Sequence, residues 1–181
     1  MRLVALTALA LASSAPIPLS GDAPYQIYDG HGGLSAGASS RLLLDYQEPY
    51  RSDILDFLYK PGFGANLHMC KVEIGGDTQS TDGTEASYKH YREEEPACGT
   101  GRGYEMWLMA EAYKRNPDVA TFILSWGVPN WVGNGSYFSE ENIDYQVGYA
   151  KCVAQTLGSD AHPSYIVSHS FVPGFGAACT R

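Results

Sequence analysis

Residues Leu67–Gly76 read LHMCKVEIGG, and this stretch decides the fold class because its residue types alternate with a period of two. In a β-strand, alternate side chains point to opposite faces. One face would carry His68, Cys70, Val72 and Ile74, and the other would carry Leu67, Met69, Lys71 and Glu73. The first face is apolar enough to pack under helices. The second becomes charged toward its carboxyl end, where a barrel would open into a pocket.

Strand-like and helical patterns alternate on both sides of this stretch. We expect further strands at Gln26–Ala36, Thr121–Trp126 and Tyr165–Val167, and helices at Pro49–Lys60, Gly103–Asn116 and Asn142–Leu157. Strands that alternate with helices of this length form a parallel sheet with crossover connections, which is an α/β architecture. In such sheets the functional groups gather beyond the carboxyl ends of the strands.

Each predicted helix carries apolar residues at helical spacing, and we expect them to face the core. In the first two helices they are Tyr50, Ile54, Phe57 and Leu58, and then Tyr104, Trp107, Leu108 and Ala112. In the third they are Ile143, Val147, Ala150, Ala154 and Leu157. Glu111 and Arg115 have the spacing of an ion pair on one helix, and Gly158 is suited to cap the end of the third helix.

The segment Asp77–Arg102 connects the second predicted strand to the second helix without a helical or strand pattern. Connections of this length in compact domains are usually functional or disordered. Its acidic run, Glu93–Glu95, predicts a solvated and mobile stretch.

The chain has 181 residues, with 12 Lys and Arg against 20 Asp and Glu, which gives a formal net charge of −8. Hydrophobic residues make up 44% and charged residues 18%, so the chain can build a sizeable core. The acidic balance argues against nucleic-acid partners and against a polybasic membrane anchor. The length fits one domain or an incomplete piece of a larger protein.

Residues 1–18 have the pattern of a secretory signal peptide. Arg2 precedes a short apolar core, and small residues suited to cleavage follow it; the alternative is a buried N-terminal helix. No other stretch approaches the ~20 apolar residues of a transmembrane helix. We therefore expect a soluble product of the secretory route, lysosomal or secreted, in which the sequon at Asn134 is a glycosylation site.

Cysteines and histidines give no metal-binding pattern. Cys70, Cys98, Cys152 and Cys179 contain no C-x-x-C spacing, and the five histidines form no H-x-H or H-E-x-x-H cluster. We expect no metal and no other cofactor. In an oxidising compartment the four cysteines allow three disulfide pairings, among which the sequence does not choose.

Carboxylates are the better candidates for chemistry. Glu73 and Asp77 flank the end of the second strand, and Asp82 and Glu85 follow it. Retaining glycoside hydrolysis uses two carboxyl groups ~5–5.5 Å apart, and Glu73 could supply one of them. The alternative for Glu73 is a structural ion pair with Lys71, two residues away on the same strand face.

Tryptophans near the end of the third strand point to a second kind of chemistry. Trp126 and Trp131, with Pro129 between them, could stack on the apolar face of a sugar ring. The alternative is that they are core residues whose indole N–H groups are satisfied locally.

Several long motifs in this order and spacing resemble the galactosylceramidase (galactocerebrosidase) family of glycoside hydrolases, family 59. They are SRLLLDYQEPYRSDILD at 40–56, KVEIGGD at 71–77, QSTDGTE at 79–85, RGYE at 102–105, WLM at 107–109, KRNP at 114–117, and the stretch from Trp126 to Trp131. The resemblance covers roughly residues 27–135.

This resemblance implies a (β/α)8 barrel and a retaining hydrolase that removes galactose from galactosylceramide and related galactolipids. It also implies an acidic, lysosomal compartment and a saposin-type activator protein that presents the lipid. Thr81 matches the family threonine that contacts the galactose, and Trp126 matches the family tryptophan in the same pocket.

The sequence also departs from the family. The acid/base glutamate of the family lies in a Trp-Asn-Glu motif at the end of the fourth barrel strand, and the nucleophile glutamate ends the seventh; neither motif occurs here. We expect residues 25–160 to form about the first three to four βα units of the barrel, followed by a divergent tail at 161–181 from a truncated or mis-spliced product. No catalytic residue is assigned, and this chain alone should be inactive.

Three alternatives remain open. The chain could belong to another barrel β-glycosidase, or it could be a non-catalytic secreted protein that binds carbohydrate through Thr81, Trp126 and Trp131. A third alternative is that it does not fold, because an open sheet leaves unpaired edges and an exposed apolar interior.

Overall fold

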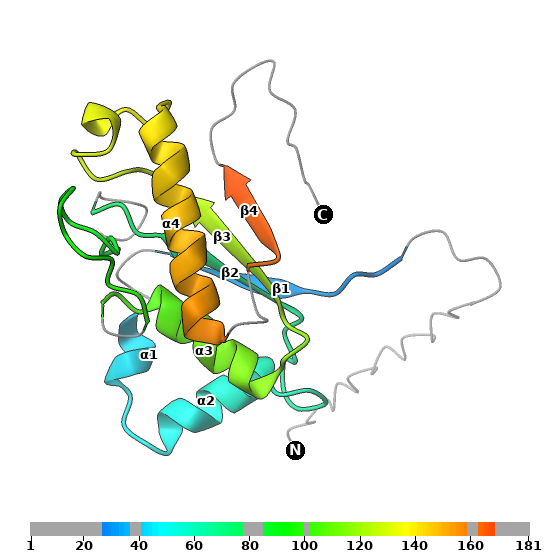
Figure 1. Ribbon diagram of the computed structural model, residues 1–181. Helices are drawn as coiled ribbons and strands as arrows, with labels where there is room; N and C mark the ends of the chain where they lie inside the picture. Colours follow the sequence, from blue (N-terminus) through cyan, green and yellow to red (C-terminus); the bar gives the residue numbers. More distant parts are fainter. Residues whose placement is uncertain (1–26, 37–40, 78–84, 100–101, 159–162, 169–181) are drawn as a thin grey trace, which may run out of the picture.

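The computed structural model describes residues 27–36, 41–77, 85–99, 102–158 and 163–168. Its four strands form one parallel sheet in chain order (Figure 1). They are β1 (Gly32–Ser35), β2 (Met69–Ile74), β3 (Ala120–Ser125) and β4 (Tyr165–Ser168). The helical elements are α1 (Leu42–Asp45), α2 (Tyr50–Tyr59), α3 (Glu105–Arg115), the 3-10 turn η2 (Gly133–Gly135) and α4 (Glu140–Leu157). The predicted α/β class, its parallel sheet and its fourth strand are confirmed.

One face of the sheet is covered by helices. Figure 1 shows α2, α3 and α4 on the same side of the strands. The β2 residues on this side, Cys70, Val72 and Ile74, are at most 1% exposed. The expectation that this face of β2 packs under helices is therefore confirmed. Burial of apolar side chains here is the main source of stability for the layer.

The other face of the sheet is hollowed. A cavity of about 350 Å³ is lined by Gly32, Gly33, Leu34, Met69, Lys71, Phe122 and Val167. Strand register places Leu34 beside Lys71, and Lys71 beside Phe122, so one row of side chains crosses three strands. The ring of Phe122 continues this row by stacking on Tyr165 of β4, with centroids 4.4 Å apart.

The predicted apolar stripe of α2 is wrong in part: Leu58 packs against the core as expected, but Tyr50 and Phe57 do not. Tyr50 and Phe57 are 66% and 54% exposed, whereas Leu55 and Tyr59 are 1% and 4% exposed. The physical reason is that the Tyr59 hydroxyl donates a hydrogen bond to the sulfur of Cys70 on β2, at 3.4 Å, so a polar group can be buried there. The expected end of the helix before Pro61 is confirmed.

The predicted stripe of α4 is likewise wrong in part: Ala150 and Leu157 pack against the core as expected, but its first two members do not. Ile143 and Val147 are 63% and 42% exposed, and the buried face carries Asn142, Tyr145, Tyr149, Cys152 and Val153. Tyrosine hydroxyls and a disulfide decide this orientation, and hydropathy alone does not register them. Ser139 caps the start of α4 by accepting the amide of Asn142 at 3.2 Å, and Gly158 follows its end as expected.

The α3 prediction is largely confirmed. Leu108 and Ala112 are buried, and the expected pair between Glu111 and Arg115 is present. Arg115 also donates to Asp56 at 2.7 Å, which joins α3 to α2.

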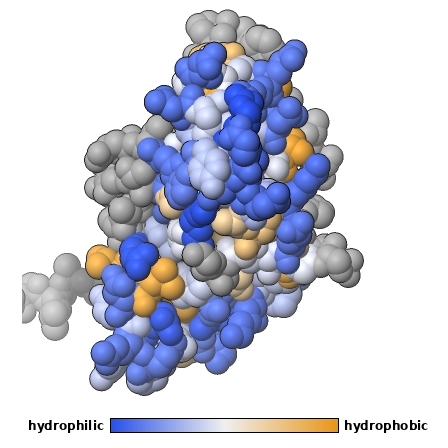
Figure 2. Space-filling view, turned by 60° about the vertical axis from the view of Figure 1, so that its left-hand side comes forward, coloured by the Kyte–Doolittle hydropathy of each residue, from blue (hydrophilic) through white to orange (hydrophobic). Residues whose placement is uncertain are grey.

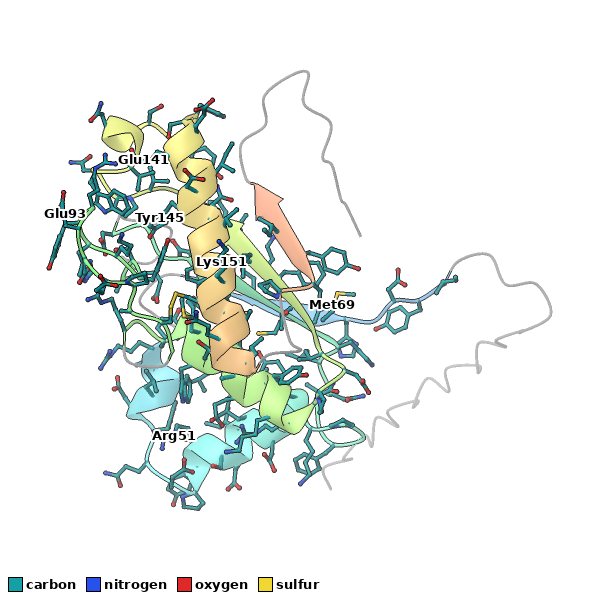
Figure 3. All side chains as sticks on the ribbon, viewed as in Figure 1. Arg51, Met69, Glu93, Glu141, Tyr145 and Lys151 are labelled. Atoms are coloured by element: carbon teal, nitrogen blue, oxygen red, sulfur yellow. A yellow bond between two sulfur atoms is a disulfide. The ribbon has the colours of Figure 1, made fainter. Side chains whose placement is uncertain are left out.

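Residues 85–99 have no helix or strand, but they are anchored to the rest of the fold. The expectation of a solvated, mobile run at 93–95 is wrong for Glu94, whose carboxylate pairs with Arg102 at 2.5 Å and whose side chain is 14% exposed. The guanidinium holds the pKa of Glu94 at about 2. Glu93 remains exposed at the outer edge of the segment (Figure 3). The surface on this side is mainly hydrophilic, with separate hydrophobic patches (Figure 2).

Candidate functional site

The candidate site lies at the edge of the sheet where β1, β2 and β3 end, at Ser35, Ile74 and Ser125. Parallel strands end on the same side, so the turns that follow them converge there. The turns after β2 and β3 touch, since a Cβ atom on Gly76 would lie 2.7 Å from the carbonyl oxygen of Gly127. Only glycine permits this approach of two backbones.

Trp126 follows the last residue of β3 and lies at this contact between the two turns. It is partly buried, so part of its surface is open to solvent. Thr81, the other residue expected to contact sugar, lies outside the described residues. A partly exposed indole at a strand end is suited to stack on a sugar ring.

The described residues on either side of 78–84 are joined to each other. The amide of Asp77 donates to the carbonyl oxygen of Glu85 at 3.2 Å. Asp82, one of the candidate carboxylates, lies outside the described residues together with Thr81. The chain therefore leaves the end of β2 at Asp77 and returns to it at Glu85.

Glu85 reaches the N-terminus of α3. Its Oε1 accepts a hydrogen bond from the backbone amide of Tyr104 at 3.2 Å. Glu85 is buried, with 4% of its surface exposed. Gly103 has φ +65°, a backbone conformation that favours glycine, and a Cβ there would meet the Glu85 carboxylate. Burial, with a contribution from Glu73, raises the pKa of Glu85 to about 7.

Glu105 is a second buried carboxylate at the same helix terminus, and it is 1% exposed. Its Oε1 accepts hydrogen bonds from the Tyr104 hydroxyl at 2.7 Å and from Ser35 at 3.2 Å. Its Oε2 is buried with no hydrogen-bond partner among the described residues. Desolvation raises its pKa well above the usual value, and the negative charges of Glu85 and Glu73 add to the effect.

Glu73, on β2, is the third carboxylate of this group and is 1% exposed. Its backbone carbonyl accepts the hydroxyl of Tyr149 at 3.3 Å, and the carbonyl of Gly75 accepts the hydroxyl of Tyr145 at 2.5 Å. Two tyrosines of α4 therefore hold the end of β2 in place. Tyr145 lies on the side of α4 that faces the segment 85–99 (Figure 3).

Asp77, Ser87 and His90 form a hydrogen-bonded group beside the turn. Asp77 accepts the amide and the hydroxyl of Ser87 at 2.8 Å and 2.5 Å, and it contacts Nδ1 of His90 at 2.8 Å. The Ser87 hydroxyl lies 3.2 Å from the same ring nitrogen, and Ser87 is 0% exposed. A serine nucleophile needs an accessible hydroxyl and the opposite ring nitrogen of its base. The group orders the turn and does not form a catalytic triad.

Trp131 is a packing residue. Its indole N–H donates to the carbonyl of Lys89 at 3.2 Å. The cationic groups of Lys89 and Arg92 each lie 5.5 Å from its ring centroid, and the ring meets Tyr145 edge to face. The local satisfaction expected as the alternative for the tryptophans is thus found at Trp131.

Among the described residues, a disulfide joins Cys98 to Cys152 of α4. This settles the pairing of two cysteines that the sequence left open. Cys70 is a free, buried thiol whose pKa is raised to about 12, chiefly by burial. Cys179 lies outside the described residues.

No group of three or more His, Cys, Asp or Glu side chains in the described part of the chain is arranged to hold a metal ion. No helix within these ranges combines the length and the apolar character that a membrane crossing requires. Asn134 is exposed in η2, with φ 54°, where a glycosylating enzyme can reach it.

Sequence reasoning missed Glu105, Tyr145 and Tyr149. Glu105 follows the RGY stretch directly, and an acidic residue in the first turn of a helix is a normal capping signal, so its burial had no sequence cue. Tyr145, Tyr149 and Cys152 do have helical spacing, and that pattern could have been set against the Ile143 stripe.

Comparisons with known sequences agree on one family. The family model described as glycosyl hydrolase family 59 matches residues 28–177. A galactocerebrosidase from Salmo salar is 55% identical over 133 residues, which cover 73% of this chain and 19% of that protein. The galactocerebrosidase from Homo sapiens is 53% identical over 123 residues, which cover 67% of this chain and 18% of that protein. The chain thus spans about a fifth of the length of these curated relatives.

Comparisons with solved structures concern the fold alone. The catalytic domain of a GH30 xylanase C from Talaromyces cellulolyticus has a TM-score of 0.55 at 15% identity, covering 78% of this chain and 36% of that chain. An endo-beta1,6-glucanase gives the same score and identity, with 78% of this chain and 34% of that chain covered.

Proposed function

Because the chain belongs to glycosyl hydrolase family 59, we propose that it supplies the first three to four βα units of a (β/α)8 barrel that binds the galactose of galactosylceramide. Parallel strands in chain order, with the described helices α2, α3 and α4 on the same face, support this architecture. The hollow face lined by Leu34, Lys71 and Phe122 would be the barrel interior. The relatives named galactocerebrosidase support the substrate class.

The observation that carries the proposal is the position of Trp126. It follows β3 and sits where the Gly76 turn touches the Gly127 turn, at the carboxyl edge of the sheet. Active sites of barrel enzymes lie at this edge. Thr81, in the segment between Asp77 and Glu85, is proposed as the second galactose contact.

We further propose that these 181 residues release no galactose by themselves. A retaining glycosidase needs an acid/base and a nucleophile that both reach the scissile bond. Glu73, Glu85 and Glu105 are each 4% exposed or less, and Glu85 and Glu105 are bonded at the N-terminus of α3. Carboxylates in these positions stabilise the fold and do not face a sugar.

The proposed compartment, glycosylation and activator protein rest on the same family assignment. We propose a signal-directed secretory route ending in the lysosome, glycosylation at Asn134, and a saposin-type activator for the lipid substrate of the complete enzyme. The exposure of Asn134 in η2 supports the modification. A stacking platform that includes Trp131 is not favoured, because cations and Tyr145 cover that ring.

Saturation-transfer NMR on the oxidised, purified chain tests the binding role. Methyl β-galactoside should receive saturation from the wild type and from Trp131→Phe, and little from Trp126→Ala. Methyl β-glucoside is the comparison ligand, because it reveals whether the site distinguishes the two sugars. Equal saturation from the Trp126→Ala variant would remove Trp126 from the site.

A hydrolysis assay tests the proposed inactivity. The wild-type chain is incubated with galactosylceramide in detergent at acidic pH, and free galactose is measured. We expect none above a sample without protein. Galactose release that follows the chain through purification would show that a catalytic pair had been overlooked.

A further inference from the structure

Three carboxylates meet where the end of β2 packs against the start of α3. Glu73 comes from β2, Glu85 from the segment after it, and Glu105 from the first turn of α3. They influence each other electrostatically, since the charges of Glu73 and Glu85 both act on Glu105. All three residues are nearly inaccessible, with exposures of 1%, 4% and 1%.

The hydrogen bonds of this carboxylate cluster (Glu73, Glu85 and Glu105) serve to join secondary structures. Glu85 holds the backbone amide of Tyr104, and Glu105 holds the hydroxyls of Tyr104 and Ser35. The first bond ties the return of the chain near β2 to the helix, and the second ties the helix to β1. Oε2 of Glu105 has no hydrogen-bond partner among the described residues, so a full negative charge there would be poorly solvated.

Among the described residues, little positive charge acts on Glu85 and Glu105. The positive charge of Arg41 acts on Glu85 as the smallest of the causes that shift its pKa, and the N-terminus of α3 adds a partial positive charge. The other ionisable groups that face the cluster are the neutral side chains Tyr59 of α2, Cys70 of β2 and Tyr149 of α4. No metal-binding group of His, Cys, Asp or Glu occurs in the described ranges. Protonation would neutralise Glu85 and Glu105 at this site.

We propose that Glu85 and Glu105 bind protons in the folded chain in acidic solution, and that their ionisation as the pH rises weakens the contact between the end of β2 and the start of α3. A protonated carboxyl still accepts the Tyr104 amide through its carbonyl oxygen, and it carries no charge to repel its neighbours. The inference concerns the fold and stands whether or not the chain contacts a sugar.

The direction of the pH effect follows from proton binding. The pKa of Glu85 is raised from 4.5 to about 7, and that of Glu105 also rises. Between pH 4.5 and about 7, Glu85 binds more protons in the folded chain than in the unfolded chain. The free energy of unfolding therefore falls as the pH increases over this range. For Glu85 alone, the folding equilibrium constant should fall by a factor on the order of 50 between pH 5 and pH 7.5.

Urea unfolding of the oxidised 181-residue chain at several pH values from 5 to 7.5 measures this effect. Glu85→Gln and Glu105→Gln keep the shape and the accepting oxygen but cannot ionise. Each should be destabilised much less than the wild type as pH rises. Glu93 is an exposed residue of the segment 85–99, so Glu93→Gln is the matched control. This variant should retain the wild-type pH dependence.

Hydrogen exchange locates the change. The amides at the start of α3, including Tyr104, should exchange faster at pH 7.5 than at pH 5 after correction for intrinsic rates, and this difference should shrink in the Glu85→Gln chain. A wild type with pH-independent stability would refute the proposal, as would a Glu85→Gln variant with an unchanged pH dependence. Absence of a cooperative transition at pH 5 would refute it too, because the neutral cluster should be most stable there.

Discussion

Removal of the Cys98–Cys152 disulfide should cost about 4 kcal/mol of unfolding free energy. The two cysteines are separated by 54 residues in sequence. A cross-link over a loop of that length lowers the entropy of the unfolded chain, which raises the free energy of the unfolded chain by about 4 kcal/mol at 25 °C. A typical domain has only about 5–15 kcal/mol in total, so the loss would be a large fraction of its stability. The link joins the segment 85–99, which has no regular structure, to the buried face of α4.

The assay compares urea unfolding of the wild type with that of the Cys98→Ser/Cys152→Ser chain, each with and without a reductant. Reductant should lower the wild-type midpoint to that of the double variant and leave the double variant unchanged. Cys179→Ser is the control and should match the wild type. A double variant that loses less than about 1 kcal/mol, or a Cys179→Ser chain that loses as much as the double variant, would refute the pairing or its role.

Three other predictions follow from packing and exposure. Leu55→Ala should destabilise the chain by about 2–5 kcal/mol, whereas Phe57→Ala should stay within about 0.5 kcal/mol; reversed values in urea unfolding would restore the stripe expected from sequence. Gly76→Ala should cost about 2 kcal/mol, because the new Cβ meets a backbone atom that cannot rotate away, and thermal melts would detect it. Asn134→Gln should remove one glycan from the mass of the secreted chain and leave the midpoint unchanged, and an identical mass would show that the sequon is unused.

The sheet could be predicted from sequence because β2 alternates so regularly. Cys70, Val72 and Ile74 form one apolar row, and a strand with such a row must bury it. The positions of the helices were equally predictable from sequence, since Pro61 and Pro117 mark two helix ends. These signals are local, so tertiary packing does not overturn them.

The buried faces of α2 and α4 could not be predicted from hydropathy. Tyr59, Tyr145 and Tyr149 lie inward because Cys70 and two backbone carbonyls of the β2 end accept their hydroxyls. Hydropathy ranks isoleucine and valine above tyrosine, so it favours the exposed residues Ile143 and Val147. Hydrogen-bond partners that are distant in sequence determine which face of each helix is buried, and the sequence pattern of a single helix does not identify those partners.

The candidate site divides in the same way. Trp126 could be proposed from sequence because it lies at the end of a predictable strand, and function is expected at a strand end in a parallel sheet. Glu105 was missed because its burial depends on Ser35 and on Glu85, which belong to other parts of the chain. Trp131 shared the sequence signal of Trp126, yet its contacts with Lys89 and Arg92 assign it to packing.

The order of the sheet, in which each strand pairs with the strand that precedes it along the chain, has a consequence for synthesis. A ribosome releases the chain from its N-terminus, so β2 can dock on β1, and β3 on β2, before later residues exist. The paired residues of successive strands are far apart in sequence, as Gly32 and Met69 are, so these contacts are non-local and form more slowly than the helices between them. The cross-link to α4 can close only after residue 152 has emerged, so oxidation would fix an arrangement that the nascent chain had already reached.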